Sequence, residues 1–117
     1  MSPYEVVYSS SVLDDFERIA EHLFRSYVYF GENPREAVNH AQTRLSELRL
    51  FIGKLEGMPH QGVTRDDLMQ GLRILPDRRK AVIAFMVDDH RKTVHVLRVF
   101  YGGEDYDAVM ADMEDNI

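Results

Sequence analysis

A chain of 117 residues is long enough for one domain with a sizeable core and too short for two. Hydrophobic residues make up 44% of it and charged residues 29%, which is typical of globular domains and argues against disorder. The chain contains no cysteine, which excludes disulfides, thiolate metal sites and cysteine nucleophiles. We therefore expect a single domain over residues 1–117.

The net charge of −6 is concentrated in an acidic C-terminal tail, residues 104–117. Residues 71–102 are locally basic, with seven basic and three acidic side chains. Nucleic-acid-binding proteins usually carry a larger basic excess, so the composition argues against that class but leaves room for a small basic patch. The first ten residues lack the basic and apolar regions of a signal peptide, and no apolar run reaches the roughly 20 residues of a membrane helix. We expect a cytoplasmic protein without a membrane contact.

The first half of the chain predicts one strand and two helices. Residues 4–8 are rich in β-branched and aromatic side chains, which favour a strand. Apolar residues at helical spacing predict a helix over about 12–29, with Ser9, Ser10 and Ser11 as N-cap candidates. Asn33 and Pro34 then begin a second helix that ends near residues 56–57. The short turn between the helices predicts an antiparallel helical hairpin.

The second half predicts a three-stranded antiparallel meander. Residues 57–70 have no sustained period and are interpreted as a loop, with one helical turn at 66–69. Strands are predicted over about 71–76, 79–87 and 93–101, joined by hairpin loops. A short helix over 106–113 completes the chain. The fold class is therefore α+β.

The middle strand of the meander is apolar on both faces, which predicts a central strand covered on both sides. The helical hairpin accounts for one cover. The other face lacks an obvious internal cover, because only the short C-terminal helix is left for it. This mismatch predicts a partner protein.

Few residues point to chemistry. The five histidines do not have the spacing of metal ligands, and there is no glycine-rich phosphate loop, so we expect neither a metal nor a cofactor. Arg73 and Arg98 are notable because each lies between apolar residues within a predicted strand. One interpretation is that each pairs with a carboxylate or extends to the rim of the sheet. The other is that both face the uncovered side with Lys80 and Tyr101, as donors to a carboxylate or phosphate.

The chain resembles the RelE/ParE superfamily of type II toxin–antitoxin toxins over nearly its whole length. The resemblance rests on residues 4–10, 13–19, 37–48, 55–62, 71–75 and 96–106, in this order and spacing. It implies a helical hairpin packed on a curved, mainly antiparallel sheet. It also implies an antitoxin partner in a hetero-oligomer, whose C-terminal segment would supply the missing cover.

Two activities occur in this superfamily. RelE-like toxins cut ribosome-bound mRNA with several basic residues and a late tyrosine, whereas ParE-like toxins inhibit DNA gyrase. The strand that would supply lysines reads Gly-Leu-Arg-Ile-Leu here, and Tyr-Gly-Gly-Glu-Asp stands where a basic run is expected. These departures and the long hairpin favour a ParE-like inhibitor, which is not an enzyme. Because many ParE relatives carry a His-Gly-Arg-type run at that late position, the gyrase target stays open.

Two alternatives are kept. The first is a RelE-like mRNA endoribonuclease acting on the ribosome, with catalytic candidates Arg73, Lys80, Arg98 and Tyr101. The second is a non-toxic module of the same fold that only binds a partner. In every case, the residues expected to contact a target or partner are Arg73, Arg79, Val82, Met86, Arg98, Tyr101, Asp105 and Tyr106.

Overall fold

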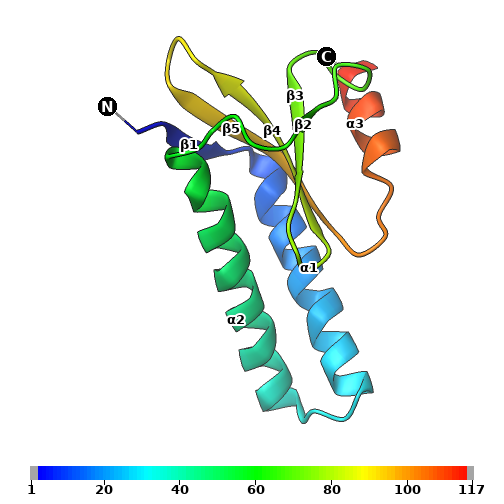
Figure 1. Ribbon diagram of the computed structural model, residues 1–117. Coiled ribbons are helices and arrows are strands. Elements are labelled where there is room, and N and C mark those ends of the chain that lie inside the picture. Colours follow the sequence, from blue (N-terminus) through cyan, green and yellow to red (C-terminus); the bar gives the residue numbers. More distant parts are fainter. Residues whose placement is uncertain (1–2, 116–117) are drawn as a thin grey trace.

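The computed structural model describes residues 3–115 and has the predicted order of elements (Figure 1). The elements are β1 (Glu5–Tyr8), α1 (Ser10–Tyr29), α2 (Pro34–Gly53), the 3-10 turn η1 (Lys54–Glu56), β2 (Val63–Thr64), β3 (Leu72–Pro76), β4 (Ala81–Asp88), β5 (Thr93–Tyr101) and α3 (Tyr106–Asp115). The α+β class, the helical hairpin, the meander and the short C-terminal helix are confirmed.

The strands form one five-stranded sheet in the order β1-β5-β4-β3-β2. β3, β4 and β5 are the antiparallel meander, and β1 pairs in parallel with β5. β2 was not predicted, because a pair of residues is too short to show a period; it adds an edge strand inside the expected loop. Gly62 leads into β2 with φ +83°, and a Cβ there would lie 2.5 Å from the backbone oxygen of Ile74. Only glycine lets the chain approach β3 this closely.

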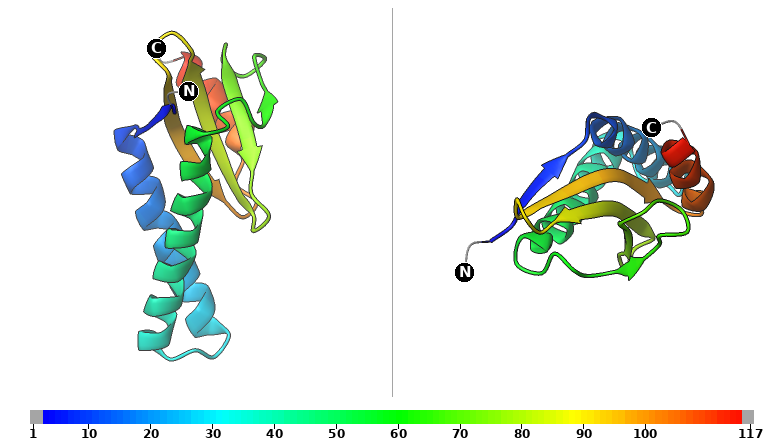
Figure 2. Two further views of the ribbon diagram at one scale, coloured as in Figure 1. Left: turned by 60° about the vertical axis from the view of Figure 1, so that its left-hand side comes forward. Right: turned by 90° about the horizontal axis from the view of Figure 1, so that it is seen from above.

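The helical hairpin packs on one face of the sheet, and its far part projects well beyond the end of the strands (Figures 1 and 2). Asn33 caps α2, since its side chain accepts a hydrogen bond from the Glu36 backbone N–H at 2.9 Å. Ser9 occupies the N-cap position of α1, but its side chain makes no capping bond. The Ser9 hydroxyl instead donates to the backbone oxygen of Leu97 at 2.7 Å, so it fastens the start of α1 to β5.

Two apolar clusters lie on opposite faces of the sheet. The larger one joins the hairpin to the face that carries Ile83 and Phe85, both fully buried. The smaller one lies under α3, whose Met110 is fully buried against Ala84 and Phe100. The expectation that this second face lacks an internal cover is therefore wrong in part: α3 packs on it, although Val82 and Met86 stay only half-buried.

None of the helices within residues 3–115 combines the length and apolar character needed to span a bilayer.

Candidate functional site

The predicted site residues do not share one face of the sheet. Arg73 pairs in register with Phe85, which faces the helical hairpin, whereas Arg98 pairs with Ala84, which faces α3. Paired residues of neighbouring strands lie on the same face. The expectation that Arg73 and Arg98 form one patch is therefore wrong, because they lie on opposite faces.

Arg98 is held by a buried carboxylate. Its Nε and Nη2 atoms donate to the two oxygens of Asp15, each at 2.9 Å, and Asp15 is only 2% exposed. Asp15 also accepts the Val99 backbone N–H at 2.9 Å and a bond from Arg18 Nη2 at 3.0 Å. The hydrogen bonds from Arg98 to Asp15 raise the pKa of Arg98 above its ordinary value. The first interpretation made from the sequence, pairing with a carboxylate, is correct for Arg98.

Arg73 fastens the loop before β2. Its Nη1 atom donates to the backbone oxygens of His60 at 3.0 Å and Gln61 at 3.4 Å. The same loop is tied to the β4–β5 turn, because His60 Nε2 lies 2.6 Å from Asp89, which also accepts the Tyr4 hydroxyl at 2.7 Å. The Tyr4 hydrogen bond, followed by the one from His60, lowers the pKa of Asp89. The guanidinium of Arg73 is thus committed to carbonyl oxygens of its own chain.

The remaining predicted residues divide between α3 and a cleft on the other face. Tyr106 is the first residue of α3, and its ring centroid lies 6.2 Å from that of Phe100 in β5. Asp105 caps α3, since its side chain accepts the Ala108 backbone N–H at 3.2 Å. Arg79, Lys80 and Tyr101 line the cleft.

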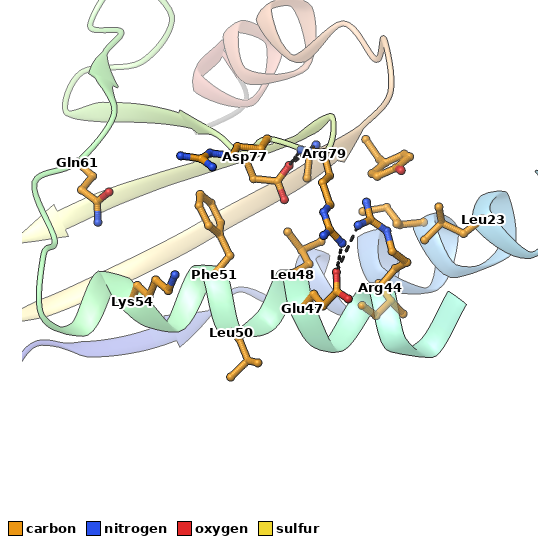
Figure 3. Close-up of a pocket in the computed structure, with 15 residues that line it drawn as sticks. Leu23, Arg44, Glu47, Leu48, Leu50, Phe51, Lys54, Gln61, Asp77 and Arg79 are labelled. Carbon is orange, nitrogen blue, oxygen red and sulfur yellow. Dashed lines mark hydrogen bonds and ion pairs between the residues drawn. The ribbon is translucent and has the colours of Figure 1, made fainter. Parts of the chain in front are cut away.

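This cleft lies between α2 and the β3–β4 hairpin, and we name it the α2–hairpin cleft. It consists of two adjoining hollows of about 670 and 440 Å³. Figure 3 shows the residues that line the larger hollow. Both hollows share Leu23, Arg44, Arg79 and Tyr101. Glu47 of α2 forms ion pairs with Arg79 across the cleft and with Arg44 at 3.3 Å. Two arginines therefore converge on a single carboxylate where the hollows meet.

Arg44 is one of several residues of this cleft that were not predicted from the sequence, together with Glu47 and Lys54. Its side chain is 17% exposed. Burial by itself would lower the pKa of Arg44, but a hydrogen bond to the Tyr101 side chain and the nearby Tyr27 and Glu47 raise it above its ordinary value. The available signal was its position, because residue 44 falls on the apolar stripe of α2 between Ala41 and Leu48.

Within residues 3–113, whose side chains the structure describes, no group of three or more histidine or acidic side chains is arranged to hold a metal ion.

The sequence matches no protein-family model, and a comparison with curated proteins finds no match. Solved structures do match. A chain of the ParDE toxin–antitoxin system from P. aeruginosa aligns over 84% of this chain and 95% of its own length, with 19% identity and a TM-score of 0.56. A chain of the toxin–antitoxin complex RelBE2 from Mycobacterium tuberculosis aligns over 86% and 99%, with 18% identity and a TM-score of 0.52.

The fold is RelE/ParE-like. At these identities the likeness concerns the arrangement of the backbone alone, and it does not separate RelE from ParE. Of the four catalytic candidates, Lys80 and Tyr101 line the α2–hairpin cleft, while Arg73 and Arg98 are held elsewhere by internal partners.

Proposed function

We propose that the chain is the toxin component of a type II toxin–antitoxin system, that it inhibits DNA gyrase in the manner of ParE, and that a cognate antitoxin neutralises it. The RelE/ParE-like fold supports the toxin class. The choice of gyrase inhibition over RNA cleavage is carried by one observation: the catalytic candidates do not converge. Arg73 and Arg98 lie on opposite faces of the sheet and are bound to groups of their own chain.

Convergence matters because RNA cleavage builds negative charge on a transferring phosphoryl group. A catalytic site must aim several preorganised donors at that one place. Arg98 Nε and Nη2 already donate to Asp15, and Arg73 Nη1 already donates to two carbonyl oxygens. Recruiting either would break internal bonds, and for Asp15 would leave a buried carboxylate short of partners. A toxin that acts by binding a protein target does not need such a site.

The antitoxin is proposed to bind the α3 face of the sheet, where Val82 and Met86 stay half-buried beside α3. A partner segment there would complete the burial of side chains that α3 covers only in part, a favourable hydrophobic contact.

A RelE-like ribonuclease is the second candidate, because Arg79, Lys80 and Tyr101 do share the α2–hairpin cleft. Purified protein separates the two functions. We expect it to inhibit supercoiling of relaxed plasmid by gyrase and to leave mRNA on stalled ribosomes uncut. A matched preparation with added antitoxin should restore supercoiling. Cleaved mRNA together with fully active gyrase would reverse the assignment, and no effect in either assay would leave the non-toxic binding module.

A further inference from the structure

The α2–hairpin cleft carries positive charge on a chain that is acidic as a whole. Its lining includes five cationic side chains and two carboxylates: Arg44, Lys54, Arg78, Arg79 and Lys80 against Glu47 and Asp77. Among the side chains described, those of residues 3–113, Lys54, Arg78 and Lys80 take part in no ion pair. The carboxylate of Asp77 is occupied by the backbone N–H groups of Arg79 and Ala81, at 2.7 and 3.0 Å. The cleft therefore presents an excess of positive charge.

The lining between these charges is apolar. Phe51 points from α2 toward the β3–β4 turn, Leu48 lies farther along α2, and Leu23 adds an apolar side chain from α1 (Figure 3). The larger hollow, at about 670 Å³, has the size of sites that enclose a ligand. An occupant suited to these walls has apolar groups on one side and negative charge beside them.

Glu47 indicates which negative group fits. Its carboxylate reaches across the cleft to Arg79 and also contacts Arg44 (Figure 3). The side chains of Glu47 and Arg79 are 44% and 58% exposed, and exposed ion pairs of this kind contribute little to stability. We propose that Glu47 stands in for the carboxylate of a partner, and that the α2–hairpin cleft binds an acidic amphipathic segment of another polypeptide.

The turn that carries the cations is already ordered. The Asp77 side chain holds its backbone, and the Lys80 carbonyl oxygen accepts the Gly102 backbone N–H at 3.0 Å. Lys80 itself has φ +74°, a strained conformation that persists only where the surroundings fix it. A site that is ordered before binding spends less binding free energy on ordering.

Nucleic acid fits the cleft less well. A backbone-tracking site commonly neutralises about 6–10 phosphates, more than the cations available here. Single-stranded bases also need open aromatic faces for stacking. The Tyr27 ring already lies on His40 at a centroid distance of 3.6 Å, and the Tyr101 ring lies beside that of His22, at a centroid distance of 5.8 Å.

This inference goes beyond the proposed function and does not depend on it, since the cleft would bind its segment whether or not the chain inhibits gyrase. It can be tested on the full chain by fluorescence anisotropy. The probe is a labelled helical peptide of about 15 residues with leucine at every third or fourth position and glutamate elsewhere. The matched peptides replace glutamate by lysine or leucine by serine, and a short poly(U) RNA tests the nucleic-acid alternative.

We expect the leucine–glutamate peptide to bind and both matched peptides to fail. Lys54→Glu should weaken binding about tenfold or more, and Glu47→Gln should strengthen it several-fold, because it frees Arg44 and Arg79. Arg25→Glu on the far part of α1, an exposed site outside the cleft, should change nothing. Circular dichroism checks that each variant is folded. No binding of the acidic peptide, unchanged affinity in Glu47→Gln and Lys54→Glu, or binding of poly(U) in its place would overturn the proposal.

Discussion

Asp15 and Arg98 are 83 positions apart in the sequence, and they form a two-pronged ion pair in the folded chain. The pair lies where β1 ends and leaves one edge of β5 without a neighbouring strand, since the last parallel partners are Tyr8 and Val96. Asp15 takes over the missing pairing by accepting the Val99 backbone N–H. One carboxylate thus closes the open edge of β5 and anchors α1 to it.

Asp15→Ala should lower the free energy of unfolding by about 2–4 kcal/mol, because it leaves the Val99 N–H and the half-buried Arg98 guanidinium without their partner. Urea unfolding measures the change. The control is Glu21→Ala, which breaks an exposed pair with Arg25 on the same helix and should cost about 0.5 kcal/mol or less. Equal losses in the two variants would show that Asp15 does not have this role.

Gly62→Ala should destabilise the fold by about 1–3 kcal/mol, because the added Cβ meets the Ile74 carbonyl and φ +83° is strained for alanine. Gly53→Ala is the matched control. Gly53 ends α2, and nothing lies within 4 Å of its Cβ position, so alanine should be neutral or stabilise by up to about 1 kcal/mol. A neutral Gly62→Ala in urea unfolding would mean that the loop can move away from β3.

The Tyr4–Asp89 hydrogen bond predicts a pH dependence of stability. The pKa of Asp89 is lowered from 3.8, first by the Tyr4 hydrogen bond, so its contribution is present above that value and is lost as the pH falls through the lowered pKa. The pKa of Tyr4 is raised from 10.0 by the same bond, so its contribution is present below pH 10 and is lost as the pH rises through the raised pKa.

Tyr4→Phe removes this bond, and it should flatten the change in urea midpoint both below about pH 4 and above about pH 10. Parallel curves for the variant and the parent chain would contradict the assignment. Tyr29→Phe is the control, because Tyr29 is 82% exposed at the tip of the hairpin.

Met86→Asp should weaken binding of the antitoxin about tenfold or more, because it places a charge on the half-buried face beside α3 that is proposed to receive the partner. Isothermal titration calorimetry with a co-purified antitoxin measures the affinity. Leu13→Asp, at an exposed leucine of α1 away from that face, is the matched control. Full affinity in a folded Met86→Asp variant would exclude this face as the antitoxin site.

The order of elements could be predicted from the sequence because it depends on local periods. The α2 start is an example, since Asn33 and Pro34 are a local signal that needs no knowledge of the rest of the chain. Two features could not be predicted in this way: the parallel pairing of β1 with β5, and the short strand β2. Both depend on contacts between separate segments of the chain, which a local period does not show.

The side chains of the site could be predicted only in part, and Arg98 shows why. Leu97 and Arg98 are neighbours in β5, and the pairing of β5 with β4 shifts register opposite them, between Ala84 and Phe85. Such a shift changes the alternation of faces along a strand, and a single sequence does not show it. Nothing in the sequence around Asp15 shows that the fold buries its carboxylate, which is only 2% exposed. Alternation located the strands, but it could not show which charged side chains find partners inside the molecule.

The central claim is that the chain acts on DNA gyrase and not on mRNA. The most direct test follows DNA synthesis and protein synthesis in bacteria over the first minutes after the chain is induced without its antitoxin. The account predicts an early fall in DNA synthesis while translation continues. An early fall in translation, with DNA synthesis declining only later, would contradict it and make the Lys80 and Tyr101 side of the α2–hairpin cleft the first place to look for a nuclease site.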